Sequence, residues 1–255
     1  MTAFYLKLFI TPALMWAISS ASRRWGTQLG GLLSGLPVTS ALVMLFLSLE
    51  QGSAFVARAV PGALAGLAAI QATYLFYFLV TRRVPALLGC LAGLGFYALT
   101  AWAISRLGGV ALPVLITLLL VTAIVIVTAR QPTPPAASGP VVLPRWVIPM
   151  RMLAATGLLL AITASAEWLG PTASGLVAPI PVIAWPLMVF AHVQGGRHEL
   201  AAVVRGNAIG AVGVVGFYLM LAHGVLAWGA LPSIGVAVLL AVLITFGLAK
   251  AVNRG

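Results

Sequence analysis

Apolar runs of about 20 residues follow one another along almost the whole chain, with short polar breaks between them. A bilayer core is roughly 30 Å thick, so runs of this length predict membrane-spanning helices. The nine predicted segments are residues 3–22, 27–48, 54–80, 84–105, 109–129, 146–167, 172–193, 199–221 and 229–250. Between the fifth and the sixth, the stretch RQPTPPAASGPVVLPR is too rich in Pro, Ser and Gly to sustain a helix, and it is predicted to be a linker.

The composition agrees with this pattern. Hydrophobic residues make up 62% of the 255 positions and charged residues 7%, and the mean hydropathy is +1.14. A soluble domain typically carries about 25% charged residues. The sequence therefore predicts an integral membrane protein, with the cell inner membrane as its expected location and membrane lipid as a partner.

The basic residues are the next informative feature, because 14 Lys and Arg face only three acids and give a net charge of +11. They stand singly or in pairs between apolar runs, which is typical of orientation signals and argues against a nucleic acid partner. One side of the nine-span arrangement receives Arg23, Arg24, Arg82, Arg83, Arg130, Arg145, Arg151, Arg197, Lys250 and Arg254. The opposite side receives Lys7 and Arg106. This asymmetry predicts an external N-terminus and a cytoplasmic linker and C-terminus.

The chain repeats itself with a shift of 144 residues, which aligns residues 7–52 with 151–196 without a gap. The aligned pairs include Gly26/Gly170, Gly31/Gly175, Pro37/Pro181 and Gly52/Gly196, and Lys7 aligns with Arg151. After three inserted residues, Arg58–Gly66 aligns with Arg205–Gly213. The first apolar run and the SSAS that follows it resemble a cleaved signal peptide, but the retained counterpart favours a true span.

Helices one to four therefore correspond to helices six to nine. The copies start five spans apart, an odd number, so they enter the membrane from opposite sides. We predict an all-α integral membrane protein, a single membrane domain over residues 1–255, built from two inverted four-helix repeats. Repeat one covers 1–105, repeat two covers 146–255, and residues 106–145 hold the joining fifth helix and the linker. Inverted repeats of this kind recur in secondary transporters.

Prolines interrupt the second and seventh predicted helices at corresponding places, Pro37 and the pair Pro179 and Pro181. Proline removes a backbone donor and clashes with the preceding turn. The freed groups need partners, so such breaks occur where they face protein or a water-filled cavity. A kink that only packs against a neighbouring helix is the simpler alternative. Breaks at matching positions of inverted repeats favour a binding site near the middle of the membrane.

The candidate substrate-binding residues surround these breaks and the entrances beside them. They are Ser34, Gly35, Pro37, Thr39, Ser40, Pro179, Pro181, Trp185, Arg58, Arg205 and Asn207. The two arginines lie about one turn inside a helix, where they either snorkel to the interface or draw an anionic solute toward the pathway. Asn207 and Gln71 either contact the solute or form a hydrogen bond between helices.

Catalytic and metal-binding patterns are absent from the sequence. The three glutamates lie near loop ends, the histidines fit no metalloprotease motif and the one cysteine, Cys90, stands alone, so we expect neither an enzyme nor a cofactor. His192 and His198 lack a third metal ligand, and we expect the stretch around Arg197 and Glu199 to be a solvated loop.

Together these patterns predict a multi-pass permease that moves a small solute, with an organic anion as the favoured class, by alternating access at the paired breaks. The alternatives are a membrane subunit or assembly partner without transport activity and a lipid translocase. Glycine series at residues 62–69 and 206–216 predict that helices three and eight pack at the centre.

Overall fold

The computed structural model describes residues 2–24, 35–129, 144–182 and 184–252. These residues form nine α-helices, and no strand occurs among them. The helices are α1 (Thr2–Arg24), α3 (Val38–Gln51), α4 (Ser53–Val80), α5 (Ala86–Ser105), α6 (Ala111–Ala129), α7 (Val147–Ala164), α8 (Ala166–Val177), α9 (Ala184–Trp228) and α10 (Ala230–Val252).

Six of these helices, α4, α5, α6, α7, α9 and α10, are long and apolar enough to cross a membrane. Two further apolar segments, Tyr5–Ala17 in α1 and Val38–Gln51 in α3, are shorter. All backbone donors and acceptors of a helix interior are paired within the segment, so a helix is one of the two structures that can span hydrocarbon. The all-helical fold of the described residues, with six long apolar helices, is consistent with a multi-pass membrane protein.

Six predicted segments agree with helices of the structure within a few residues: α1, α4, α5, α6, α7 and α10. The predicted span 172–193 instead divides into α8 and the first part of α9. The predicted loop between residues 193 and 199 is reduced to a sharp kink at Gly196 with helix on both sides. Residues 193–196 are exposed, but Glu199 is buried, so the expectation of a solvated loop is wrong for Glu199. The first half of predicted span 27–48 lies mostly outside the described residues.

Two glycines bend the chain where a half-length helix meets a long one. Gly52, between α3 and α4, has φ 85° and ψ 164°. Gly196, inside α9, has φ 68° and ψ −157°. Both values lie in a region that is essentially restricted to glycine. Gly196 thus divides α9 into a first part, residues 184–195, and a second part, residues 197–228, which we name α9a and α9b.

The helices α4 and α9 form the centre of the molecule. Buried residues make up 72% of the apolar window of α4 and 67% of that of α9, against 17% for α5 and 28% for both α6 and α10. This arrangement agrees with the glycine series predicted to pack centrally. Gly62 and Gly66 of α4 face the backbone carbonyls of Thr172 and Leu176 so closely that a Cβ would overlap them.

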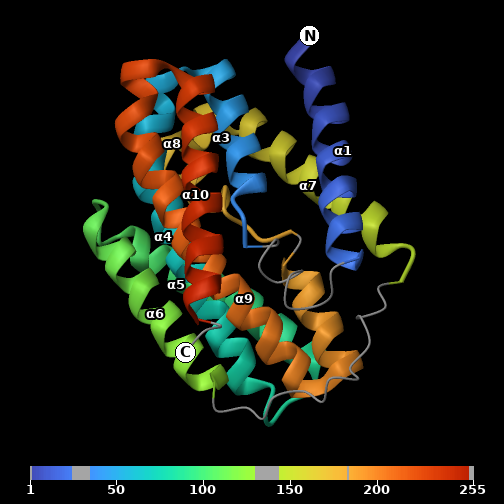
Figure 1. Cartoon of the computed structure of the whole chain (residues 1–255). Helices are drawn as coiled ribbons and strands as arrows, with labels where there is room; N and C mark the ends of the chain where they lie inside the picture. The colour runs from blue at the N-terminus through green and yellow to red at the C-terminus, as the bar shows by residue number, and fades with distance from the viewer. Residues whose placement is uncertain (1, 25–34, 130–143, 183, 253–255) are drawn as a thin grey trace.

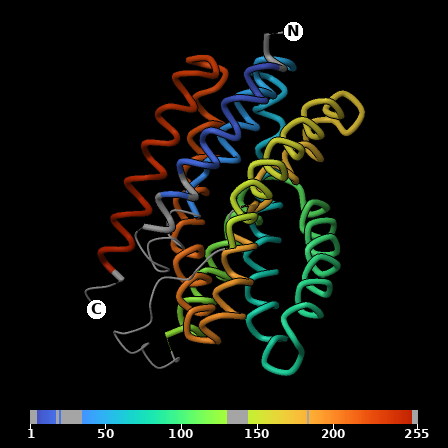
Figure 2. Tube along the Cα trace, turned by 90° about the vertical axis from the view of Figure 1, so that its right-hand side faces the viewer, coloured from blue at the N-terminus to red at the C-terminus, as the bar shows by residue number. Residues whose placement is uncertain are grey.

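The two broken segments run in opposite directions from the middle of the molecule. Figure 1 shows α3 rising toward the end where the chain begins, while α9a descends toward the other end. The long helices that follow, α4 and α9b, return in opposite directions as well. Figure 2 shows α5 and α10 on opposite sides of the molecule. The proline breaks therefore lie in the interior, between helices that point away from them.

Candidate functional site

The first break precedes α3. Gly35 and Leu36 form a turn, Pro37 is the N-cap residue, and the helix starts at Val38. The Val38 N–H donates to the Leu36 carbonyl at 2.8 Å, and the Ala41 N–H donates to the Pro37 carbonyl at 2.7 Å. The first N–H groups of a helix have no acceptor within that helix, and Pro37 supplies no side-chain cap. The break thus leaves backbone donors at the start of α3.

The second break separates α8 from α9 and repeats this geometry. The Val182 N–H donates to the Ile180 carbonyl at 3.0 Å, and the Trp185 N–H donates to the Pro181 carbonyl at 3.0 Å. Each of these bonds lies 144 residues after its counterpart in the first break. The two prolines therefore sit in the same local backbone structure, which proline dictates in part by fixing its φ and lacking an N–H.

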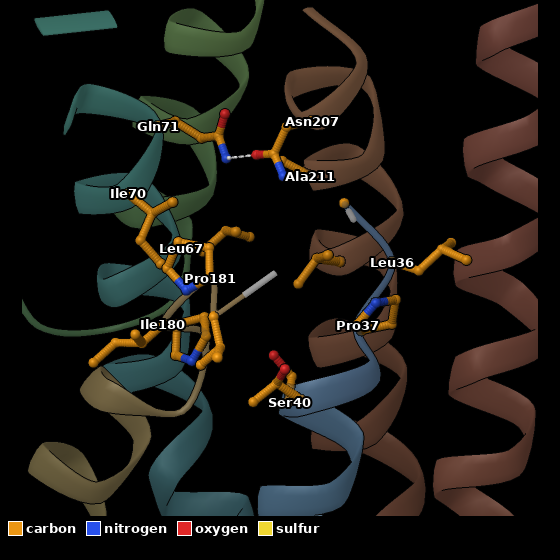
Figure 3. Close-up of a pocket in the computed structure, with 15 residues that line it drawn as sticks. Leu36, Pro37, Ser40, Leu67, Ile70, Gln71, Ile180, Pro181, Asn207 and Ala211 are labelled. Carbon is orange, nitrogen blue, oxygen red and sulfur yellow. Dashed lines mark hydrogen bonds between the residues drawn. The ribbon is translucent and has the colours of Figure 1, made fainter. Parts of the chain in front are cut away.

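The two breaks meet at one cavity of about 40 Å³. A water molecule needs about 10–15 Å³ of such space, so there is room for roughly three or four waters. The described residues that line it are Gly35, Leu36, Pro37, Thr39, Ser40, Leu67, Ile70, Gln71, Pro179, Ile180, Pro181, Val182, Asn207, Ala211 and Val214. Figure 3 shows them coming from both breaks and from the central helices. None of these described lining residues is charged.

A pair of amides bridges the central helices at this cavity. Gln71 of α4 donates from Nε2 to Oδ1 of Asn207 of α9b at 3.4 Å, a long hydrogen bond (Figure 3). The exposed fractions of the two residues are 1% and 5%. Gln71 Oε1 has no hydrogen-bond partner within the described part of the chain. The bond between helices is the simpler of the two roles expected for these amides, yet both side chains also line the cavity.

Seven of the residues that the sequence marked as candidates surround the cavity: Gly35, Pro37, Thr39, Ser40, Pro179, Pro181 and Asn207. That they bind a ligand stays a prediction. Ser34 lies outside the described residues. Arg58 is exposed and Arg205 is half-buried, and neither lines the cavity.

Trp185 does not line the cavity either, and it packs among aromatic residues of α4. Its ring is stacked on Tyr74, with centroids 6.0 Å apart, and meets Tyr77 edge-on at 5.6 Å. Gly93 of α5 lies so close that a Cβ there would reach the indole ring. Trp185 therefore fixes the start of α9 against α4 and α5.

A basic side chain, that of Lys7, is buried away from the cavity, and the sequence did not predict that it would join helices. Lys7 of α1 is 5% exposed, forms an ion pair with Glu50 at the end of α3, and donates to Oγ1 of Thr163 of α7 at 2.7 Å. Arg151, the residue aligned with Lys7 in the second repeat, is 0% exposed. The signal in the sequence was the alignment of two basic residues inside predicted spans, since ionisable side chains within a span face the interior of the helix bundle and pair there.

The helix junction at Gly196 is exposed at residues 193–196, and the side chains on either side of it contact α4. The hydroxyl of Tyr77 and Nδ1 of His192 are 3.0 Å apart. Arg197 donates to the Phe78 carbonyl at 2.8 Å, with its guanidinium carbon 4.4 Å from the centroid of that ring. Glu199 is 4% exposed. No group of three or more possible metal ligands occurs among the described residues.

Comparison with protein-family models, with curated proteins and with solved structures finds no match. Function is therefore inferred from the residues of this chain and their geometry alone.

Proposed function

We propose that the protein is a membrane permease that moves a small solute, with an organic anion as the favoured class, through a site at the paired proline breaks. One observation carries the proposal: two breaks 144 residues apart share the same hydrogen bonds and line one cavity with polar groups at its wall. Irregular backbone at membrane depth is tolerated where it lines a cavity, and transporters bind substrate at such broken helices.

The geometry around the breaks supports an inverted repeat and hence alternating access. The equivalent glycines Gly52 and Gly196 both have positive φ with extended ψ. The segments α3 and α9a leave the cavity in opposite directions (Figure 1). Two halves related by an axis in the membrane plane can exchange conformations, which opens the same site first to one side and then to the other.

The proposed orientation has the N-terminus outside and the C-terminus in the cytoplasm, in the cell inner membrane. It is supported by the excess of Arg on one side of the alternating loops, as in Arg82 and Arg83. In this orientation α3 runs from the cavity to the external face and α9a runs to the cytoplasmic face.

Arg58 and Arg205 are proposed to gather an anionic solute at opposite entrances. The exposure of Arg58 and the half-burial of Arg205 fit an entrance better than a binding site. Removing a steering charge lowers the rate of encounter, so we expect Arg58→Ala and Arg205→Ala to slow uptake at low solute concentration and at low salt. Equal uptake rates for the wild type and both variants under these conditions would show that the two arginines do not gather the solute.

The test of the proposed function is transport by the purified protein. A deletion strain is first screened for altered uptake and export across a solute panel, and the solutes found are then measured in proteoliposomes. Asn207→Leu is expected to reduce flux strongly, whereas Gln51→Leu, half-buried at the end of α3 away from the cavity, is not. Movement of labelled lipid without solute flux would instead identify a lipid translocase. The absence of both activities would favour a membrane subunit or assembly partner.

A further inference from the structure

Three arginines gather where α4 ends and α9 bends. Arg82 and Arg83 lie in the turn after α4, and both are exposed. Arg197 directly follows the kink at Gly196 and is half-buried. Figure 1 and Figure 2 show the turn after α4 and the bend of α9 at the same end of the molecule. We name Arg82, Arg83 and Arg197 the arginine cluster.

Two guanidinium groups of the cluster lie beside one aromatic ring. The guanidinium carbon of Arg197 is 4.4 Å from the centroid of the Phe78 ring, and that of Arg82 is 5.8 Å from it. The two carbons are therefore no farther apart than the sum of these distances. Arg197 also donates from Nη2 to the Phe78 carbonyl at 2.8 Å, and Phe78 is buried. These contacts fix Arg197 at the end of α4 and hold two like charges near each other.

The chain supplies no carboxylate to balance these charges. It contains three acidic residues, and all of them belong to the part that the structure describes. Glu50 pairs with Lys7. Glu167 stands in the first turn of α8, which starts at the opposite end of the molecule (Figure 2). Glu199 is buried and forms no ion pair with the cluster. The carbonyl end of α4 offsets about half a charge, so the protein leaves most of the charge of the cluster unbalanced.

Basic residues near span ends also act as orientation signals. Such signals need only remain on one side of the membrane, and they need not converge. Arg106 at the other end of α5 illustrates the difference, because its guanidinium carbon is 5.5 Å from the centroid of Trp102 and no second arginine contacts that ring within the described residues. The convergence of two arginines on Phe78 is therefore more than orientation requires.

The depth of the cluster indicates the kind of anion. The candidate span in α4 ends at Val80 and that in α5 begins at Ala86, with the two exposed arginines between them. In a bilayer this is the depth of the phospholipid phosphates, directly outside the hydrocarbon core. Leu87 and Leu91, four residues apart on one face of α5, are exposed and can contact acyl chains. Arginine binds phosphate through two parallel N–H groups.

From these observations we infer that the arginine cluster binds the phosphate headgroup of an anionic phospholipid, such as phosphatidylglycerol. The exposed Arg82 and Arg83 contact the phosphate, and Arg197, fixed at Phe78, adds its charge from the more buried side. A zwitterionic headgroup carries an amine that the same charges repel, so the site discriminates between the two lipid classes. The inference adds a lipid site to the proposed permease and does not depend on solute transport.

The test compares matched ligands on the purified protein in detergent. Native mass spectrometry measures the binding of phosphatidylglycerol and of phosphatidylcholine with identical acyl chains, and thermal melts measure the effect of each lipid on unfolding. Inorganic phosphate and soluble glycerophosphoglycerol are the probes for a free anion. We expect phosphatidylglycerol to bind at least about fivefold more tightly than phosphatidylcholine, since one arginine near an anionic lipid contributes roughly this factor. The soluble anions are expected to leave the melt unchanged.

Variants assign the preference to the cluster. Arg82→Gln and Arg197→Gln are each expected to lower the preference for phosphatidylglycerol about fivefold. Arg197→Lys keeps the charge but loses the planar fork of donors, so we expect an intermediate loss. Arg106→Gln is the matched control, because it removes the same charge from an exposed arginine that also contacts an aromatic ring. The control is expected to leave the preference nearly unchanged.

Equal affinity of the wild type for the two lipids, or equal losses in Arg82→Gln and Arg106→Gln, would overturn the lipid site. Binding of phosphate or glycerophosphoglycerol as tight as that of the lipid would show a site for a soluble anion instead. If the melt shows that Arg197→Gln does not fold, Arg82→Gln at an exposed position decides the question. None of these measurements uses solute flux, so either proposal can fail while the other stands.

Discussion

At the scale of single residues, glycines set how closely the central helices approach. A Cβ on Gly175 of α8 would overlap the carbonyl oxygen of Ala59, and one on Gly210 would overlap the backbone of Gly35. Helix association in a membrane depends on van der Waals packing and small residues, because lipid tails are as apolar as leucine. These glycines therefore hold the broken segments against α4 and α9b.

We predict that Gly175→Ala lowers the free energy of unfolding in detergent by about 1–3 kcal/mol, the usual cost of overpacking. The obstacle is backbone, which cannot move aside like the tip of a flexible side chain. Gly247→Ala in α10 is the matched control, since nothing lies within 4 Å of its added Cβ. Alanine is the better helix former, so the control is expected to be neutral or stabilising. Equal thermal unfolding of the two variants would contradict the close packing.

A second feature at this scale is the buried ammonium of Lys7, which contacts Glu50 and Thr163 and so joins α1 to α3 and α7. Taking one partner away from a buried pair leaves a charge with poor solvation, which costs more than the pair itself contributes. Glu50 is partly exposed, with 28% of its side chain accessible, so water softens the loss.

We predict that Glu50→Gln lowers the free energy of unfolding by about 1–3 kcal/mol and that adding Lys7→Met recovers part of it. The double variant removes the buried charge that the single variant leaves behind. Flux per folded protein is expected to stay near that of the wild type, because Glu50 does not line the cavity. Unfolding is followed by a thermal melt. Additive losses in the double variant would show that the two residues do not act as a pair.

At the scale of elements, the breaks follow from a few residues whose effect could be foreseen. Pro37 and Pro181 marked the interruptions in the sequence, and in both copies the same two backbone hydrogen bonds form around them. The boundaries of the elements were harder to predict from the sequence. Residues 193–199 contain two glycines and three charged or ionisable residues and so favour a loop, but Arg197 bonds the Phe78 carbonyl and only Gly196 leaves the helical conformation, as a sharp kink between two helical parts. Tertiary contacts overrode the local pattern.

Gly52 and Gly196 test whether the two junctions are equivalent. We predict that Gly52→Ala and Gly196→Ala each lower the free energy of unfolding by about 1–3 kcal/mol, the cost of holding an L-residue in a glycine-only region. No atom lies within 4 Å of an added Cβ at either site, so the cost is one of backbone conformation. Gly95→Ala, in a helix and equally unobstructed, is the control. A cost at only one junction would mean that the two copies differ there.

At the scale of the whole molecule, the sequence predicted an all-helical membrane protein because a 20-residue apolar run can pair all its backbone groups in a bilayer by forming a helix. It also predicted that Pro37, Pro181 and their neighbours lie close together, through the repeat. It did not predict that Trp185 stacks on α4 instead of lining the cavity. Which way a side chain points depends on helix rotation, and in a helix that is apolar all round hydrophobic periodicity does not define that rotation.

The orientation of the whole chain is the remaining prediction. The helix α5 has 20 residues, which at about 1.5 Å per residue spans roughly 30 Å, so Arg83 and Arg106 at its two ends are expected on opposite faces of the membrane. Single cysteines at these exposed positions are introduced into a Cys90→Ser background. By the positive-inside rule, a membrane-impermeant maleimide is expected to label position 106 in intact cells and position 83 only after permeabilisation. Labelling of position 83 alone in intact cells would reverse the orientation, and labelling of both would show that α5 does not span the membrane.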